Sequence, residues 1–288
     1  MRSETEMLDL ILSVAREDER IRAVIMNGSR TNPHARRDPF QDYDIVYLVA
    51  DVAPFRRNLA WIARFGERMI LQMPDDMGDA PPLTDSFCYL MQFMDGNRID
   101  LTFYPLVQLA ELARDSLSLL LLDKDGLVTP FPPPDDSNYR PTPPTAKQFA
   151  DCCNEFWWVS TYVAKGLWRQ EITYAKSMHD QIVRVQLMKM LAWYVGVQTH
   201  FTRSAGKEGK YLQQVLAPEL WRLLLATYTD ADFARTWDAL FATCALFRRV
   251  ALPVAEHFAY AYPQDDDARV SAHLAHVREL PQDATTIY

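Results

Sequence analysis

The sequence predicts an α+β protein built of two parts, a mixed α/β part followed by an all-helical one. In the first half, short β-branched apolar runs alternate with segments of helical periodicity. Residues 130–144 then hold seven prolines, which lack the backbone N–H that a helix or a central strand needs. After them, apolar residues recur every three or four positions with few helix breakers. A length of 288 residues suits about two domains, so we expect domains at 1–130 and 145–288, joined by a linker at 131–144.

The first half is expected to form a sheet with helices around it. A turn at Asn27-Gly28 ends the first strand, and Asp95-Gly96-Asn97 supplies the glycine-containing turn of a β-hairpin. The expected elements are, in chain order, a helix over 4–20, strands over 21–26 and 44–49, a helix over 54–65, a strand over 68–73, hairpin strands over 85–94 and 98–104, a helix over 105–114, and a strand or buried helical turn over 118–122.

The second half is expected to be almost entirely helical. The periodic segments are 145–168, 173–198, 217–228, 230–262 and 265–278. A glycine-containing break at 206–210 separates two of them.

The net charge of the chain and its distribution indicate which class of binding partner is expected. The formal net charge is −8, and basic residues are scattered rather than gathered into a stripe. Because a nucleic-acid binder usually carries such a stripe, no nucleic-acid partner is expected. An acidic surface suits a cationic small molecule, since fields of opposite sign steer the encounter. It also serves solubility alone.

Cysteine usage and hydropathy indicate a cytoplasmic protein. None of the four cysteines forms a C-x-x-C pair, which is typical of reduced, buried thiols. These are Cys88, Cys152, Cys153 and Cys244. The first 22 residues lack an apolar signal core, and the longest aliphatic run, Leu119 to Leu122, is far too short to span a bilayer. We therefore expect no membrane association. We also expect a monomer or a small homo-oligomer.

Two short motifs indicate phosphate and metal chemistry. Gly28-Ser29-Arg30 follows a strand and precedes an expected helix start, where backbone N–H groups, a hydroxyl and a guanidinium can hold a phosphate. Asp42 and Asp44, two apart at the start of the next strand, point to the same face. Two like charges held together favour a cation, and magnesium prefers such oxygen ligands. Each motif alone is also compatible with an ordinary turn, cap or strand end; together they are more specific.

A third carboxylate extends the cluster. In the strand over 98–104, Ile99 and Leu101 alternate with Asp100, which therefore points to the opposite face. If this strand neighbours the one that carries Asp44, three carboxylates converge as two-metal phosphoryl transfer requires. Otherwise Asp100 is a solvent-facing strand residue.

These motifs resemble the nucleotidyltransferase superfamily that shares its fold with DNA polymerase β. Longer strings are similar to the aminoglycoside 6-adenylyltransferases, also called streptomycin adenylyltransferases, and they cover essentially the whole chain. They are DPFQDYD at 38–44, TAKQF at 145–149, DCCNEFWW at 151–158, YVAKGLWR at 162–169, GKEGKY at 206–211, RELPQDA at 278–284 and the final Ile287-Tyr288.

The resemblance implies an enzyme that moves AMP from ATP to a hydroxyl of a cationic aminoglycoside such as streptomycin, giving antibiotic resistance. It implies a nucleotidyltransferase domain followed by a helical domain, with ATP and Mg²⁺ between them. Asp42 and Asp44 would hold the metals, and Asp100 would either complete the metal site or accept the proton of the attacking hydroxyl. Two alternatives are a nucleotidyltransferase with another acceptor and a non-catalytic ligand-binding protein. The three clustered carboxylates argue against the second.

Residues of the helical part are candidates for acceptor binding. Glu155, Trp158, Tyr162 and Lys165, together with Arg169, recur at helical spacing and share one face. That face either contacts the drug or is an amphipathic packing face with snorkelling side chains; the residues alone favour packing. Further along the chain, the carboxylates of Glu171 and Asp180 would suit guanidinium groups, since they accept bidentate hydrogen bonds.

The segment over 206–210 does not match the glycine spacing of a P-loop. Lys207 or Lys210 can nevertheless reach the triphosphate of ATP from the helical part, or the segment is an exposed turn. His273 and His276, three residues apart, lack further ligands at metal-binding spacing and are expected at the surface.

Overall fold

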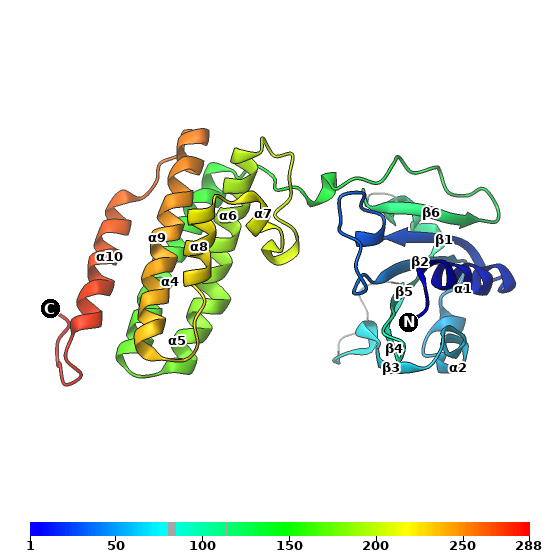
Figure 1. Cartoon of the computed structure of the whole chain (residues 1–288), viewed down its shortest axis with the longest axis horizontal. Helices are drawn as coiled ribbons and strands as arrows, with labels where there is room; N and C mark the ends of the chain where they lie inside the picture. The colour runs from blue at the N-terminus through cyan, green and yellow to red at the C-terminus, as the bar shows by residue number, and fades with distance from the viewer. Residues whose placement is uncertain (80–84, 113–114) are drawn as a thin grey trace. The chain divides into compact units, whose positions relative to one another are not determined.

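The computed structural model describes residues 1–79, 85–112 and 115–288, and these form two compact units (Figure 1). Unit 1 comprises Met1–Asn138 and unit 2 comprises Tyr139–Tyr288, so the chain passes from one to the other within the proline-rich stretch. Unit 1 is mixed α/β and unit 2 is helical, which confirms the predicted α+β class. None of the described helices is both long and apolar enough to cross a membrane.

In the described part of unit 1, six strands form one sheet in the order β3-β4-β5-β2-β1-β6. Their bounds are β1 Ile21–Asn27, β2 Tyr43–Val49, β3 Arg68–Gln72, β4 Phe87–Phe93, β5 Arg98–Pro105 and β6 Ser118–Asp123. Strands β2 and β5 pair in parallel, while the other neighbouring pairs are antiparallel. The predicted hairpin is confirmed as β4 and β5, and the segment over 118–122 proves to be an edge strand.

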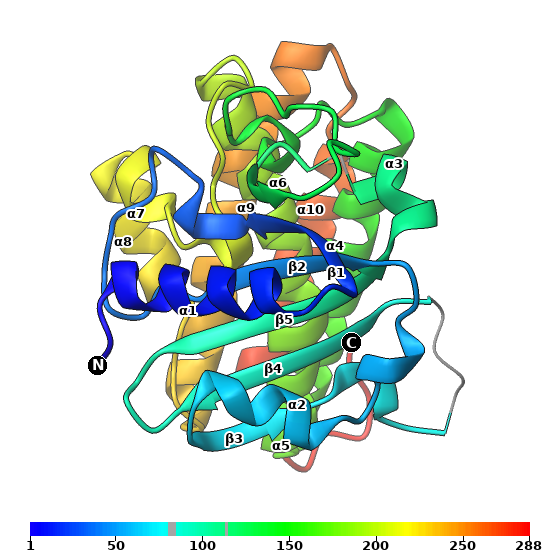
Figure 2. The ribbon, with the colours of Figure 1, turned by 90° about the vertical axis from the view of Figure 1, so that its right-hand side faces the viewer.

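One face of this sheet carries the main core of unit 1. Helix α1 (Glu4–Glu17) begins at Ser3, whose hydroxyl and the Glu6 carboxylate form a capping box. Helices α1 and α2 (Leu59–Ile62) lie on the same face of the sheet (Figure 2) and bury apolar side chains against it. The core beneath them is rich in aromatic rings, including a stacked pair of Phe55 and Phe103 whose centroids lie 4.3 Å apart.

The opposite face of the sheet is covered by a smaller apolar cluster. Val46 and Leu48 of β2 pack there with residues such as Val128. Because side chains alternate along a strand, Asp44 belongs to this same face, near the start of β2. The main core thus anchors the sheet from one side and leaves the other side for polar groups at the start of β2.

Two predicted helices of unit 1 are wrong in extent. The segment over 54–65 is broken into 3₁₀ turns at Ala53–Phe55 and Ala63–Phe65 on either side of α2. The break lies at Arg57, whose φ of +55° is left-handed, and Asn58 then caps α2 by accepting from the Trp61 N–H. The segment over 105–114 begins as a 3₁₀ turn and continues as α3 (Leu109–Leu112); residues 113–114 lie outside the described residues.

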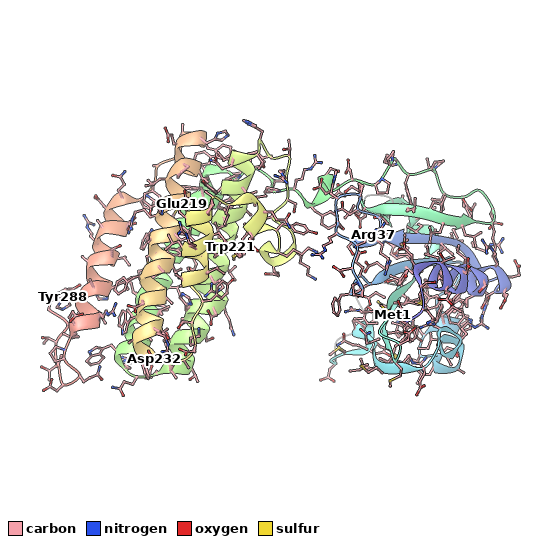
Figure 3. All side chains as sticks on the ribbon, in the orientation of Figure 1. Met1, Arg37, Glu219, Trp221, Asp232 and Tyr288 are labelled. Atoms are coloured by element: carbon pink, nitrogen blue, oxygen red, sulfur yellow. The ribbon has the colours of Figure 1, made fainter. Side chains whose placement is uncertain are left out.

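Unit 2 is a bundle around one core, with Phe156 and Phe247 stacked at its centre (centroids 3.7 Å apart). Its two longest helices begin at polar caps: Thr145 caps the first of them, and Asp232, labelled in Figure 3, caps the longest by accepting from the Arg235 N–H. The described helices are α4 Ala146–Trp168, α5 Ile172–Met178, a π-helical turn His179–Val183, α6 Arg184–Gln198, α7 Leu212–Val215, α8 Pro218–Ala226, α9 Phe233–Phe258 and α10 Gln264–Glu279.

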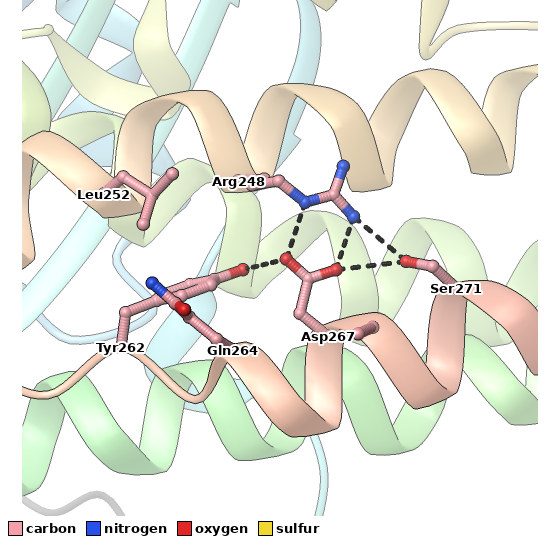
Figure 4. A pocket seen from close by; sticks show the side chains of 7 residues that line it. Arg248, Leu252, Tyr262, Gln264, Asp267 and Ser271 are labelled. Carbon is pink, nitrogen blue, oxygen red and sulfur yellow. Dashed lines mark hydrogen bonds and ion pairs between the residues drawn. The ribbon is translucent and has the colours of Figure 1, made fainter.

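A small cavity of about 280 Å³ lies between α9 and α10, and four of its polar side chains are bonded to one another (Figure 4). Asp267, only 4% exposed, accepts from Arg248, from the Tyr262 hydroxyl at 2.7 Å and from the Ser271 hydroxyl at 3.0 Å. The Arg248 guanidinium approaches this carboxylate with both Nε and Nη2. This network joins α10 to α9, so we assign it to the stability of the bundle.

Candidate active site

Gly28 sits at the end of β1 in a conformation and a space that exclude other residues. Its φ is +76°, and a Cβ atom built on it would lie 2.1 Å from Oδ2 of Asp44. The predicted helix start at Ser29-Arg30 is wrong, because Gly28–Arg30 form a single 3₁₀ turn. A phosphate there would meet turn N–H groups without the dipole of a long helix.

The three predicted carboxylates come from two adjacent strand ends. Asp44 in β2 lies directly opposite Asp100 in β5 in the parallel register, and Asp42 immediately precedes β2. Side chains opposite one another in adjacent strands point to the same face. The pairing of β2 with β5 therefore brings the carboxylates to one face of the sheet, as was predicted for the case that these strands are neighbours.

Burial and neighbouring charges raise the pKa of two of these carboxyl groups, Asp44 and Asp42. Burial, followed by the charges of Asp100 and Asp42, raises the pKa of Asp44 to about 6. Burial also raises the pKa of Asp42, and Asp100 adds to this while Arg98 opposes it. Concentrated negative charge of this kind favours a cation and is typical of functional sites.

Arg98 is a member of the cluster that the sequence analysis did not single out. Its Nε and Nη2 donate to the two carboxylate oxygens of Asp100 at 2.7 and 2.8 Å, and Nε lies 3.7 Å from Oδ2 of Asp42. Within residues 1–79, 85–112 and 115–288, no three acidic, histidine or cysteine side chains are arranged to hold a metal ion. In this arrangement the guanidinium of Arg98 supplies the positive charge that offsets the carboxylates of Asp42 and Asp100. The two-residue spacing of Arg98 and Asp100 on one strand face was the available signal.

Arg30 lies differently from the predicted phosphate ligand. It is 7% exposed, its guanidinium donates to the backbone carbonyls of Asp42 (3.0 Å) and Gln41 (2.9 Å), and it stacks 3.7 Å above the ring of Tyr43. This geometry supports a role in positioning the backbone that carries Asp42. A direct contact of Arg30 with phosphate stays a prediction.

Gln41 and Asp115 are two further neighbours that the sequence analysis missed. Nε2 of Gln41 donates to the Ser29 carbonyl at 3.3 Å, whereas its buried Oε1 has no hydrogen-bond partner among the described residues. Asp115 adds to the charges that raise the pKa of Asp44. Neither residue stands at a spacing that would have linked it to the motifs.

In unit 2, the face of α4 that is a candidate for drug binding is largely exposed, and two of its aromatic side chains are hydrogen-bonded to one another. Trp158 is 59% exposed, and its Nε1 donates to the Tyr162 hydroxyl at 2.7 Å. Lys165 lies with its Nζ 4.6 Å from the centroid of the Tyr162 ring. Glu155, one turn before Trp158, is exposed as well. Glu155, Trp158 and Lys165 are therefore accessible to a ligand, whereas Tyr162 also packs against the core of unit 2.

The two remaining predicted carboxylates differ in their surroundings. Glu171 is exposed at the start of α5, where its side chain makes no capping hydrogen bond. Asp180 lies in the π-helical turn, and its oxygens contact Lys176 at 3.1 Å, Arg184 at 3.2 Å and His179 at 3.0 Å. Its charge is already matched, so Glu155 and Glu171 are the stronger candidates for a cationic ligand.

The lysines of the 206–210 segment are exposed around a 3₁₀ turn at Lys207–Gly209. Nζ of Lys210 lies 5.1 Å from the Tyr211 ring centroid. Their contact with a triphosphate stays a prediction.

Comparison with known proteins decides the family. The family model described as streptomycin adenylyltransferase matches residues 1–277. The chain belongs to the streptomycin adenylyltransferase family. The chain is 44% identical to the aminoglycoside 6-adenylyltransferase of Bacillus subtilis (strain 168), over 93% of this chain and 95% of that protein. It is 43% identical to the enzyme of the same name from Campylobacter jejuni, over 93% of each chain.

A crystal structure of an aminoglycoside 6-adenyltransferase from Bacillus subtilis is 39% identical and matches with a TM-score of 0.48, covering 97% of this chain and 100% of that one. Membership in the streptomycin adenylyltransferase family makes the chain a nucleotidyltransferase. The family and the enzyme class predicted from the motifs are thereby confirmed.

Proposed function

We propose that this nucleotidyltransferase transfers AMP from Mg²⁺-bound ATP to a hydroxyl of streptomycin or a similar aminoglycoside, in the cytoplasm, and so confers resistance. The observation that carries the proposal is the group of Asp42, Asp44 and Asp100 beside the Gly28 turn. The names of its relatives, aminoglycoside 6-adenylyltransferases, support the acceptor.

The cluster supplies oxygen ligands suited to a divalent metal, and within the described residues Arg98 contacts two of these carboxylates instead. Carboxylate oxygens are the ligands that magnesium prefers. Burial and then the charges of Asp100 and Asp42 raise the pKa of Asp44, and a cation would offset that negative charge. Asp42 and Asp44 would hold the metal, which when bound would stabilise charge on the attacking and leaving oxygens. Gly28 offers a backbone surface without a Cβ, and Oε1 of Gln41 is a buried acceptor to which no group in the described part of the chain donates.

The chain's own groups would mainly position the reactants. The N–H groups and hydroxyl of the Gly28-Ser29 turn would hold the triphosphate, and Arg30 would keep Asp42 in place. Asp100 would either ligate the metal or accept the proton of the attacking hydroxyl.

A cationic acceptor fits the exposed residues of unit 2. Glu155 and Glu171 are solvent-accessible carboxylates, and the exposed ring of Trp158 can stack on a guanidinium. Changing either acid to glutamine should raise the KM for the drug with little change in kcat, because the contact is made equally in ground and transition states. Unchanged KM values in both variants would assign drug binding to other residues.

Mass spectrometry tests the proposed function directly. Streptomycin incubated with the protein, ATP and Mg²⁺ should gain the mass of one AMP, and Asp44→Asn should abolish the gain. Fragmentation or NMR of the product would then locate the modified hydroxyl. If streptomycin and related aminoglycosides all stay unmodified while the wild-type protein is folded, the acceptor assignment is wrong.

A further inference from the structure

We propose that Arg98 is a built-in counter-cation of the carboxylate cluster, which competes with the divalent metal for Asp100. In the metal-free protein the guanidinium stabilises the cluster, and on metal binding it leaves Asp100. The inference deepens the proposed function, because it rests on the metal role given there to the carboxylates.

The contacts of Arg98 support this role. Two of its N–H groups donate to both oxygens of Asp100, a bidentate pair, and Nε also lies 3.7 Å from Asp42. The guanidinium thus touches two of the three carboxylates proposed for the metal site. Because Arg98 occupies both oxygens of Asp100 and a metal ion would be repelled by the adjacent guanidinium, the two cations compete at Asp100.

Arg98 is free to move, which separates it from the structural arginine of the site. Its side chain is 38% exposed, whereas Arg30 is 7% exposed and is fixed by two backbone carbonyls and the Tyr43 ring. All the side-chain contacts given for Arg98 within the described residues are with carboxylates of the cluster. It can therefore leave Asp100 without breaking a contact to the core.

The exchange of cations has a consequence for the order of binding. A metal ion that arrives alone must displace Arg98 and leave the guanidinium without its acceptor. A metal ion that arrives with a triphosphate brings anionic oxygens to which a released guanidinium can donate. Arg98 should therefore weaken the binding of free metal more than that of metal with nucleotide, so that the two are taken up together.

Manganese binding to the full chain without nucleotide tests the inference, with Mn²⁺ as the paramagnetic probe. We expect Arg98→Gln to bind Mn²⁺ more tightly than the wild type, by roughly two- to tenfold for a half-exposed ion pair. Arg98→Lys keeps a charge but loses the bidentate geometry, so it should lie between the two. In the presence of EDTA, Arg98→Gln should unfold at a lower temperature than the wild type.

The matched control is Arg22→Gln. Arg22 makes the same bidentate contact, through Nε and Nη2, with Asp125. This pair lies at the start of β1, at the other end of that strand from Gly28, and the side chain of Arg22 is 26% exposed. This variant should keep the wild-type affinity for Mn²⁺, because Asp125 is not part of the cluster.

The outcomes separate the two proposals. Equal or weaker Mn²⁺ binding by both Arg98 variants, with normal binding by the wild type, would overturn the role of Arg98 and leave the metal site standing. An absence of Mn²⁺ binding in the wild type and all variants would overturn the metal assignment itself. If Arg98→Gln does not fold, the Lys variant decides: an affinity no greater than that of the wild type contradicts the competition.

Discussion

Replacing Asp44 by asparagine should stabilise the metal-free protein while abolishing its activity. Burial and the charges of Asp100 and Asp42 raise the pKa of this carboxyl from 3.8 to about 6. A carboxyl with a raised pKa is favoured in its neutral form by the fold. Below pH 3.8 the carboxyl is neutral in both the folded and the unfolded chain, so it does not change the free energy of unfolding. As the pH rises from 3.8 through about 6, the unfolded chain ionises first and the free energy of unfolding falls. Asparagine keeps the shape of the side chain and has no charge to lose.

The magnitude follows from the same values. The rise from 3.8 to about 6 corresponds to about 3 kcal/mol above neutral pH. Because the side chain is partly exposed, solvent screening brings the expected gain to about 1–3 kcal/mol. The gain should shrink through the window between pH 6 and pH 4 and vanish below it.

Calorimetric unfolding in EDTA at pH 8 and again below pH 4 measures this difference. Asp125→Asn provides the control, since its hydrogen bonds with Arg22 lower the pKa of that exposed carboxyl, and its loss should destabilise at pH 8. An Asp44→Asn protein that is no more stable than the wild type at pH 8 would refute the reasoning. So would a gain that persists unchanged at low pH.

Three further substitutions probe the site and the bundle. Gly28→Ala should lower kcat about 10²-fold with the fold retained, because the new Cβ would displace the Asp44 carboxylate 2.1 Å away; wild-type turnover would show that this contact does not matter. Asp100→Asn should be partly rescued by excess Mg²⁺ if the residue is a metal ligand. If it is the general base, its kcat should stay low at saturating Mg²⁺, and wild-type kinetics would exclude both roles. Asp267→Asn should cost unit 2 about 2–3 kcal/mol in urea unfolding, because Arg248 loses its charged acceptor; a neutral effect would make the network dispensable.

The parts of the fold that were predicted correctly are those fixed by local patterns. Alternation along β5 separated Asp100 from Ile99 and Leu101, and the structure pairs this strand with β2. The turn at 95–97 joins β4 to β5 as the glycine required. The capping residue Thr145 likewise marks the start of α4. The alternation, the turn and the cap each act within a few residues, whereas the pairing of β5 with β2 was only a condition of the predicted cluster.

The parts that could not be predicted depend on contacts that are distant in the sequence. The helix expected over 54–65 is broken by a left-handed residue, and Asn58 there also donates its N–H to the Tyr89 hydroxyl of β4. The π-helical turn in the segment expected to be one continuous helix begins at His179, whose ring contacts Thr243 of α9. Apolar periodicity carries no information on either contact.

The same distinction explains the candidate site. Spacing placed Asp42 and Asp44 on one face and would have placed Arg98 beside Asp100, but nothing local showed that Arg98 would also approach Asp42, or that Arg30 would be buried against the ring of Tyr43. Both arginines carry one positive charge and differ only in their surroundings. Their separate roles, one mobile and one structural, follow from exposure and partners, which only the folded chain defines.

The charged cluster lies on strands that are stabilised from their other face. β5 carries Asp100 on one face and Phe103 on the other, where Phe103 stacks on Phe55 and contacts Tyr47 edge-on at 5.9 Å. The Tyr47 hydroxyl, itself in β2, donates to the Ile11 carbonyl at 2.6 Å and ties the sheet to α1. Aromatic pairs of this kind add about 0.5–1.5 kcal/mol each beyond the area they bury, which is comparable to the destabilisation expected from the ionised Asp44. The aromatic core can therefore hold β2 and β5 in register while their polar ends keep a charge density that only a bound cation, first Arg98 and then the metal, relieves.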